Sequence, residues 1–213
     1  MKAFIFDLDG TLLDSMGAWK NLGYEYLYSK GIKNIEENLR ETLRTMSLLE
    51  TANYFMTEYN IKLSAEQIYN EINKLIEVQY KYNVQPKDGV LEFLEKHKDR
   101  KMCIATATDR FLVEHALKRI EIEDYFDFII TSSEVGNSKE NPDIFIRAAE
   151  MLAMDIDKII VFEDALHAIK SAKSAGFYTV GIYEKCFEDD QDRIKTIADE
   201  YIENLNELNV IDN

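Results

Sequence analysis

The chain is poor in cysteine, in positive charge and in long apolar runs, and each shortage argues against a class of protein. Its only two cysteines, Cys103 and Cys186, stand far apart and in no metal-ligand spacing, so neither a disulfide framework nor a zinc site is indicated. No apolar run approaches the length of a membrane span. With 25 basic against 40 acidic residues, the net charge of −15 argues against binding to nucleic acid or to an anionic membrane, because both need a basic surface. An anionic ligand would therefore need a local positive site.

The hydrophobic fraction of 46% is nevertheless large enough for a substantial core, and 213 residues allow one large domain or two modest ones. An apolar strand is predicted to begin at the second residue, which leaves no room for a signal peptide. We therefore expect a cytoplasmic protein. The sequence has no internal repeat and no low-complexity segment.

The most informative stretch lies at the N-terminus. Residues 3–6 form an apolar run that Gly10 cuts off, which predicts a short buried strand. Asp7 would stand at the carboxyl end of this strand and Asp9 in the loop just beyond it, where open parallel sheets place their ligands. Two carboxylates at this spacing can converge on one Mg²⁺, and an aspartate can attack phosphorus. The alternative for a lone Asp-x-Asp pair is a strand that simply ends in polar residues.

The sequence Asp7-Leu-Asp9-Gly-Thr-Leu, preceded by an apolar strand, resembles the first motif of the haloacid dehalogenase-like (HAD) superfamily of phosphohydrolases. The resemblance implies that Asp7 is a nucleophile that forms an aspartyl-phosphate. It also implies that Asp9 is the general acid and base and that its backbone carbonyl is a ligand of Mg²⁺.

Three further motifs follow in the order that this family has them. The predicted strand at residues 102–106 ends in Thr106-Ala107, where a hydroxyl and successive backbone amides can hold phosphate oxygens. Lys139 precedes a helix that starts at a proline, and the resemblance is to the lysine that neutralises the nucleophile and the transferring phosphoryl group. Taken alone, a threonine at a strand end or an isolated lysine is more often structural.

The fourth motif is the acidic pair Glu163-Asp164 at the end of another predicted strand. In the family such acids bind Mg²⁺ directly or through water. Asp164 is therefore the first candidate for a direct ligand and Glu163 the less certain one. The four motifs together cover residues 1–14 and about 85–181.

The stretch from 15 to 82 differs, because its apolar residues recur with a period of 3.6 and it contains no convincing strand. We predict that Asn34 caps a helix in which apolar residues recur every four positions: Ile35, Leu39 and Leu43. Capping boxes at Ser47 and Ser64 predict two more helices, the last ending before Pro86. This insert resembles the all-helical cap of the phosphoglycolate phosphatase and β-phosphoglucomutase branch, which closes over the site and selects the substrate.

From residue 85 on, predicted strands and helices alternate, with one helix capped by Asn141 and started by Pro142, and a weak strand near residues 201–202. Regular alternation with apolar strands predicts a parallel sheet covered by helices on both faces. The prediction is an α/β fold, with a doubly wound, Rossmann-like HAD core at residues 1–14 and 84–213 and an inserted helical cap domain at 15–83.

The predicted function is a Mg²⁺-dependent phosphatase that hydrolyses a small phosphorylated metabolite and acts as a monomer or weak dimer. Thr11 favours a phosphatase over a β-phosphoglucomutase-like phosphotransferase, since the mutases more often have an apolar residue there, and Trp19 stands where they carry a histidine. The Glu163-Asp164 pair argues against a metal-free dehalogenase, whereas a non-catalytic binding module stays an alternative. The candidates for contacting the substrate from the helical insert are Ser15, Trp19, Arg44 and Lys74.

Overall fold

The computed structural model describes residues 2–43, 46 and 48–208, so Arg44 and the predicted cap at Ser47 lie outside the described residues. The chain divides into two compact units. One unit contains the residues up to Ser15 together with those from Val84 on, and the other is Met16–Asn83. Within the described ranges, no helix is long and apolar enough to cross a membrane.

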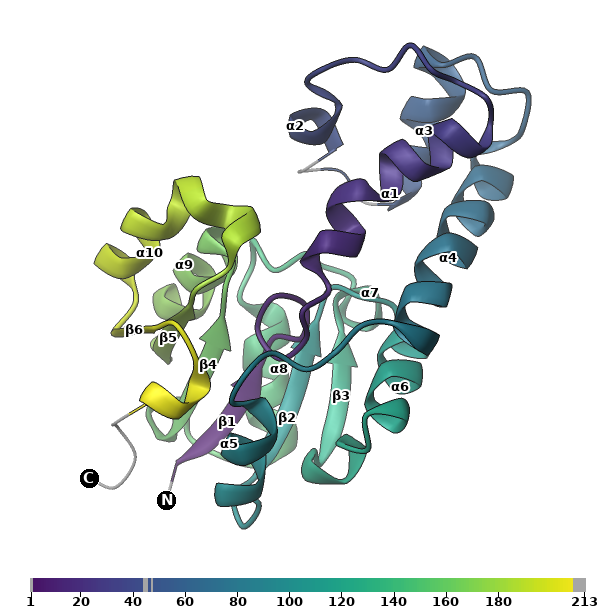
Figure 1. Cartoon of the computed structure of the whole chain (residues 1–213). Coiled ribbons are helices and arrows are strands. Elements are labelled where there is room, and N and C mark those ends of the chain that lie inside the picture. The colour runs from purple at the N-terminus through teal and green to yellow at the C-terminus, as the bar shows by residue number, and fades with distance from the viewer. Residues whose placement is uncertain (1, 44–45, 47, 209–213) are drawn as a thin grey trace. The chain divides into compact units, whose positions relative to one another are not determined.

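The first unit is built on one six-stranded sheet in which all neighbouring strands are parallel (Figure 1). The strand order is β3-β2-β1-β4-β5-β6, so the direction of winding reverses at β1. The strands are β1 (Ala3–Phe6), β2 (Met102–Thr106), β3 (Phe128–Thr131), β4 (Ile159–Glu163), β5 (Tyr178–Ile182) and β6 (Glu200–Ile202). The predicted doubly wound α/β fold is confirmed, including the weak strand near residues 201–202.

Helices connect these strands as the alternation predicts. They are α5 (Val90–Lys96), α6 (Arg110–Arg119), α7 (Ser132–Val135), α8 (Asp143–Leu152), α9 (Leu166–Ser174) and α10 (Gln191–Ile197). Short 3₁₀ turns fill the remaining connections: η1 (Glu123–Tyr125), η2 (Ile156–Lys158), η3 (Lys185–Asp190) and η4 (Leu205–Glu207).

The central strand β1 is buried on both faces, because its side chains alternate between two helical layers. Ile5 belongs to a cluster that includes Phe145 of α8. Phe4 and Phe6 point the other way, and their rings lie 5.7 and 6.1 Å from that of Phe93 in α5. Figure 1 shows α5 and α8 on opposite sides of the sheet. This double cover fixes the register of β1 and therefore the position of the residues that follow it.

Two details around the third strand differ from the prediction. Helix α8 begins at Asp143 with Pro142 as its N-cap, so the predicted cap at Asn141 is wrong. The backbone N–H of Asn141 instead donates to Ser138 in a turn. Helix α7 was not predicted, although Thr131 and Glu134 form a capping box at its start.

The second unit is helical, as the period of 3.6 predicts. It contains α1 (Met16–Ser29), α2 (Leu39–Leu43), α3 (Leu48–Glu58) and α4 (Ala65–Tyr82). The capping box at Ser64 is confirmed, with Gln67 as its reciprocal partner, and α4 ends before Pro86 as predicted. The rings of Tyr26 and Phe55 stack at 5.6 Å in the core between α1 and α3.

The predicted start of this helix after Asn34 is wrong, because the helical part of the described segment begins only at Leu39 and covers Leu39–Leu43. Tertiary contacts hold the preceding segment in another conformation. The backbone N–H of Glu36 donates to Tyr59 at 3.5 Å, and the Glu36 carboxylate accepts from Tyr54 at 3.2 Å. These bonds to residues of the α3 region outweigh the weak helical preference of a short polar segment.

Candidate active site

The carboxyl ends of β1 and β4 bring acidic side chains together at the point where the winding of the sheet reverses. Phe6 pairs with Phe162 in the parallel register, and the N–H of Asp7 donates to the carbonyl of Phe162 at 2.9 Å. Asp7 therefore lies beside Glu163 and Asp164, although about 150 residues of sequence separate them. Such a reversal opens a crevice at the ends of the strands and is the usual ligand site of an open α/β sheet.

A buried lysine joins two of these acids. The Lys139 ammonium, which is 4% exposed, donates to Oδ1 of Asp7 and, at 2.7 Å, to Oε1 of Glu163. The other oxygen of Glu163 accepts the backbone N–H groups of Asp164 and Ala165 at 3.0 and 2.9 Å. Both oxygens of Glu163 therefore accept hydrogen bonds from the protein, and Oε1 accepts the bond from Lys139. Lys139 thus places one positive charge among these acids, and its role towards an anionic ligand stays a prediction.

The charges in this cluster are perturbed by burial. Burial raises the pKa of Asp7 to about 8, opposed by the Lys139 charge and reinforced by Glu163 and Asp9. Burial, with the charges of Glu163 and Asp7, also raises the pKa of Asp164 well above its usual value. Burial acts to lower the pKa of Lys139, but the charges of Asp7 and Glu163 outweigh it and raise that pKa. Without a further cation, the site therefore disfavours the ionised forms of Asp7 and Asp164.

The donor set fits a hard divalent cation. One oxygen from each of Asp7, Glu163 and Asp164 can be chosen so that all lie within 4.8 Å of one another. Oδ2 of Asp164 is buried and has no hydrogen-bond partner among the described residues, while Oδ1 accepts from the Thr11 hydroxyl at 3.5 Å. A buried carboxylate oxygen without a donor is costly unless a cation meets it. Oxygen donors of this kind suit Mg²⁺.

Asp9 has a different environment from Asp7. Gly10 adopts a positive φ of 88°, which lets residues 8–13 close into a tight loop with backbone bonds to Leu8 and Leu13. The Asp9 carboxylate accepts from the hydroxyls of Ser15 and Thr108 at 2.5 and 2.6 Å. Its side chain is therefore outside the carboxylate cluster. A role of Asp9 in metal binding through its backbone carbonyl stays a prediction.

Thr106 ends β2, next to β1 in the sheet, and is 1% exposed. Its oxygen accepts the backbone N–H of Thr108 at 3.0 Å, so its own O–H points elsewhere. Ala107 follows it as an exposed residue of the same turn. A hydroxyl donor beside a turn of backbone amides can bind oxygens of an anion.

The sequence did not predict that the hydroxyls of Ser15 and Thr108 bind Asp9. Thr108 stands two residues after Thr106, and this spacing was the only available signal for it. Ser15 was a candidate for substrate contact, whereas the structure buries it against Asp9 in the first unit. Trp19 and Lys74 lie in the helical unit, where the Trp19 indole N–H donates to the Tyr80 hydroxyl at 2.8 Å and Lys74 is exposed.

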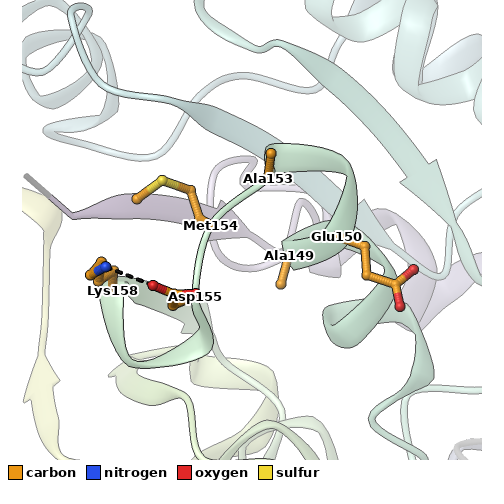
Figure 2. Close-up of a pocket in the computed structure, with 6 residues that line it drawn as sticks. All are labelled: Ala149, Glu150, Ala153, Met154, Asp155 and Lys158. Atoms are coloured by element: carbon orange, nitrogen blue, oxygen red, sulfur yellow. Dashed lines mark hydrogen bonds and ion pairs between the residues drawn. The ribbon is translucent and has the colours of Figure 1, made fainter.

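A small hollow of about 290 Å³ lies away from these residues, at the C-terminus of α8 and the amino end of β4 (Figure 2). It is lined by Glu150, Met154 and the exposed ion pair of Asp155 with Lys158, among others. Because it lies at the end of β4 opposite Glu163, it is not part of the candidate active site.

Comparisons with known proteins agree with this geometry. The sequence model of the family described as Haloacid dehalogenase-like hydrolase matches residues 4–182. A phosphorylated carbohydrates phosphatase of Thermotoga maritima is 30% identical, over 83% of this chain and 82% of that protein. A β-phosphoglucomutase of Bacillus subtilis is 28% identical, over 85% and 83%. The solved structure of a HAD hydrolase (family IA, variant 3) from Entamoeba histolytica has a TM-score of 0.83 and 25% identity, over 99% and 96%.

Proposed function

The chain belongs to the haloacid dehalogenase-like hydrolase family and is a phosphohydrolase, and we propose that it is a Mg²⁺-dependent phosphatase of a small phosphorylated metabolite. The observation that carries the proposal is the buried group of Asp7, Glu163 and Asp164 with Lys139 at the switch point of the sheet. It combines a carboxylate nucleophile, a fixed positive charge and oxygen ligands for a cation.

In the first step, a carboxylate oxygen of Asp7 forms a bond to phosphorus while the ester P–O bond breaks. Asp9 gives a proton to the departing oxygen, so the product leaves as an alcohol. Lys139 and the Thr106 hydroxyl hold the phosphoryl oxygens, and the Lys139 charge stabilises the transition state. The bonds from Ser15 and Thr108 to Asp9 support this division of labour, because they orient one aspartate for proton transfer and leave the other for attack.

In the second step, the oxygen of a water forms a bond to the phosphorus of the aspartyl-phosphate while the P–O bond to Asp7 breaks. Asp9 takes a proton from that water, inorganic phosphate is released and the Asp7 carboxylate is restored. Asp7, Asp164 and Glu163 would hold Mg²⁺, together with the backbone carbonyl of Asp9. When bound, the ion supplies positive charge that lets a phosphate approach Asp7 and favours its ionised form.

The substrate class follows from the relatives only in outline. Because one of them is a phosphatase of phosphorylated carbohydrates, sugar phosphates are the first compounds to test. We propose that the helical unit Met16–Asn83 acts as the cap that selects among them, since the proposed chemistry uses residues of the sheet unit alone.

The test compares the unmodified protein with Asp7→Asn on a generic aryl phosphate, with and without Mg²⁺. Asn is nearly isosteric with Asp but is not a nucleophile, so phosphate release should be lost while the fold is kept. Asp124→Asn, an exposed residue of η1, is the matched control and should keep full activity. Phosphate release by Asp7→Asn at the unmodified rate would remove Asp7 as the nucleophile.

A β-phosphoglucomutase-like phosphotransferase is the second candidate, favoured by the 28% identity to the Bacillus subtilis enzyme. The two functions differ in the fate of the phosphoryl group. A phosphatase releases inorganic phosphate in proportion to substrate consumed, whereas a mutase converts one sugar phosphate into its isomer with little release. Phosphorus NMR of a reaction with a hexose 1-phosphate separates the two.

A further inference from the structure

Lys87 is a nearly buried lysine in the turn before α5, where the sequence predicts only a chain reversal. Its ammonium donates to the carbonyl of Gly10 at 2.6 Å, the carbonyl of Tyr183 at 2.7 Å and Oε2 of Glu184 at 3.1 Å. An ammonium has three N–H donors, so all three are used. The side chain is 18% exposed. Lys87 is therefore built into the fold rather than solvated.

The first acceptor belongs to the loop of the active site. Gly10 follows Asp9 directly, and its carbonyl lies in the peptide that leads to Thr11, whose hydroxyl donates to Asp164. The loop closes through the N–H of Gly10 on the carbonyl of Leu13 at 2.8 Å. Lys87 thus holds the backbone between Asp9, the proposed general acid and base, and Thr11, which contacts the carboxylate cluster.

The backbone of Lys87 and its acidic partner Glu184 are also held by hydrogen bonds. The backbone N–H of Lys87 donates to the carbonyl of Leu12 at 2.9 Å. Glu184, which is 6% exposed, uses its second oxygen to accept the N–H of Cys186 at 3.0 Å and so caps η3. Because both the backbone and the ammonium of Lys87 are bound, its side chain has little freedom to move. The ammonium can therefore keep the Gly10 carbonyl in one position.

We propose that Lys87 is a positioning residue of the reaction, whose ammonium fixes the Gly10 carbonyl and thereby the placement of Asp9 and Thr11 over the carboxylate cluster. The proposal rests on the proposed function, because Asp9 matters here as the proton donor and acceptor. Asp9 is held from two directions, by Ser15 and Thr108 on its side chain and by Lys87 on the next peptide. Because its three N–H donors are used by the protein, Lys87 has none left to donate to a substrate.

The experiment measures Lys87→Met by steady-state kinetics on an aryl phosphate and by amide hydrogen exchange. A displacement of a catalytic group by about 1 Å can cost about 10²-fold in rate, so kcat should fall by about 10- to 100-fold. KM should stay unchanged, since no group that binds the substrate is removed. Exchange should become faster at the amides of Gly10, Leu12 and Leu13, which close the loop, and not at the amides of β1 or β4.

Two variants separate this role from general effects. Lys87 and the exposed Lys185 both line a second hollow of about 440 Å³ in the sheet unit. Lys185→Met removes the same charge from this hollow and should leave kcat and exchange unchanged. Glu184→Gln keeps both carbonyl contacts of Lys87 and should keep the rate. If Lys87→Met alone does not fold, Lys87→Met with Glu184→Gln removes the unpaired buried carboxylate and is measured in its place.

An unchanged kcat in the folded Lys87 variant would overturn the proposal, and so would a loss of kcat with faster exchange throughout the sheet unit. The failure of the proposed function is a distinct result, in which the unmodified protein releases no phosphate from any ester tested. In that case, hydrogen exchange at the amides of Gly10, Leu12 and Leu13 still tests the role of Lys87. Equal exchange rates at these amides in Lys87→Met and in the unmodified protein would overturn the positioning role independently of activity.

Discussion

Asp164→Asn should change the stability of the protein in opposite directions with and without Mg²⁺. Without a metal, Asp164 lies in a buried cluster of three carboxylates and one ammonium. Two like charges 4.8 Å apart repel by about 3.5 kcal/mol at an effective dielectric constant of about 20. Burial raises the pKa of Asp164 and so already disfavours its charged form, which makes the gain from removing the charge smaller than the full repulsion. We expect a net gain of about 1 to 2 kcal/mol, or about 2–8 °C in Tm for a chain of this size.

With Mg²⁺ the sign reverses, because the amide removes a charged oxygen ligand whose second oxygen has no protein partner. Binding stabilises the native state by RT ln(1 + [Mg²⁺]/Kd), so each tenfold loss of affinity removes about 1.4 kcal/mol of stabilisation at saturating metal. Thermal unfolding in EDTA and across a MgCl₂ titration measures both effects, with Asp124→Asn as the control. A lower Tm in EDTA together with an unmodified response to Mg²⁺ would refute both the electrostatic argument and the placement of the ion.

Three further predictions concern other parts of the chain. Asp9→Asn should lower kcat by about 10²–10⁴-fold, as is typical when a general acid and base is lost, and a near-normal rate in the aryl phosphate assay would exclude that role. Ca²⁺ should inhibit the Mg²⁺-activated enzyme, since its larger and more flexible coordination takes up additional carboxylate oxygens; activity with Ca²⁺ equal to that with Mg²⁺ would contradict the proposed geometry. Ser64→Ala should destabilise α4 by about 1 kcal/mol, because it removes the capping box with Gln67, and unchanged exchange of the first-turn amides of α4 would count against it.

Strands β1 to β4 could be predicted from sequence because each is a short, largely apolar run followed by polar residues. In β1, β2 and β4 every side chain is buried, and such strands appear in the sequence as continuous apolar segments. The start of α4 at Ser64 was also predictable, because its capping box depends only on Ser64 and Gln67, three residues apart in the sequence. Local sequence patterns failed at Ile35, where the apolar spacing was helical. There, hydrogen bonds of Glu36 with Tyr54 and Tyr59 hold the segment outside a helix.

The acidic members of the candidate site were predictable for a related reason. Asp7 and Glu163 stand at the carboxyl ends of neighbouring strands, and a parallel sheet necessarily gathers those ends at one edge. The partners that hold Asp9 were not predictable in this way. Thr108 and Ser15 approach it through turns whose course depends on the whole loop from Leu8 to Leu13, and a hydroxyl in a turn has many equivalent uses in sequence.

The buried Lys139 and the largely enclosed Lys87 show where sequence reasoning gains most from the structure. In a chain with a net charge of −15, most lysines can find an acidic neighbour at the surface, so charge alone does not mark Lys139 or Lys87. Burial does, because an ammonium is removed from water only where several acceptors replace it. Lys139 meets carboxylates 132 and 24 residues away, and Lys87 meets a carbonyl 77 residues away. Lys139 thus contacts two carboxylates of the cluster, and Lys87 contacts the backbone of the loop that carries Asp9.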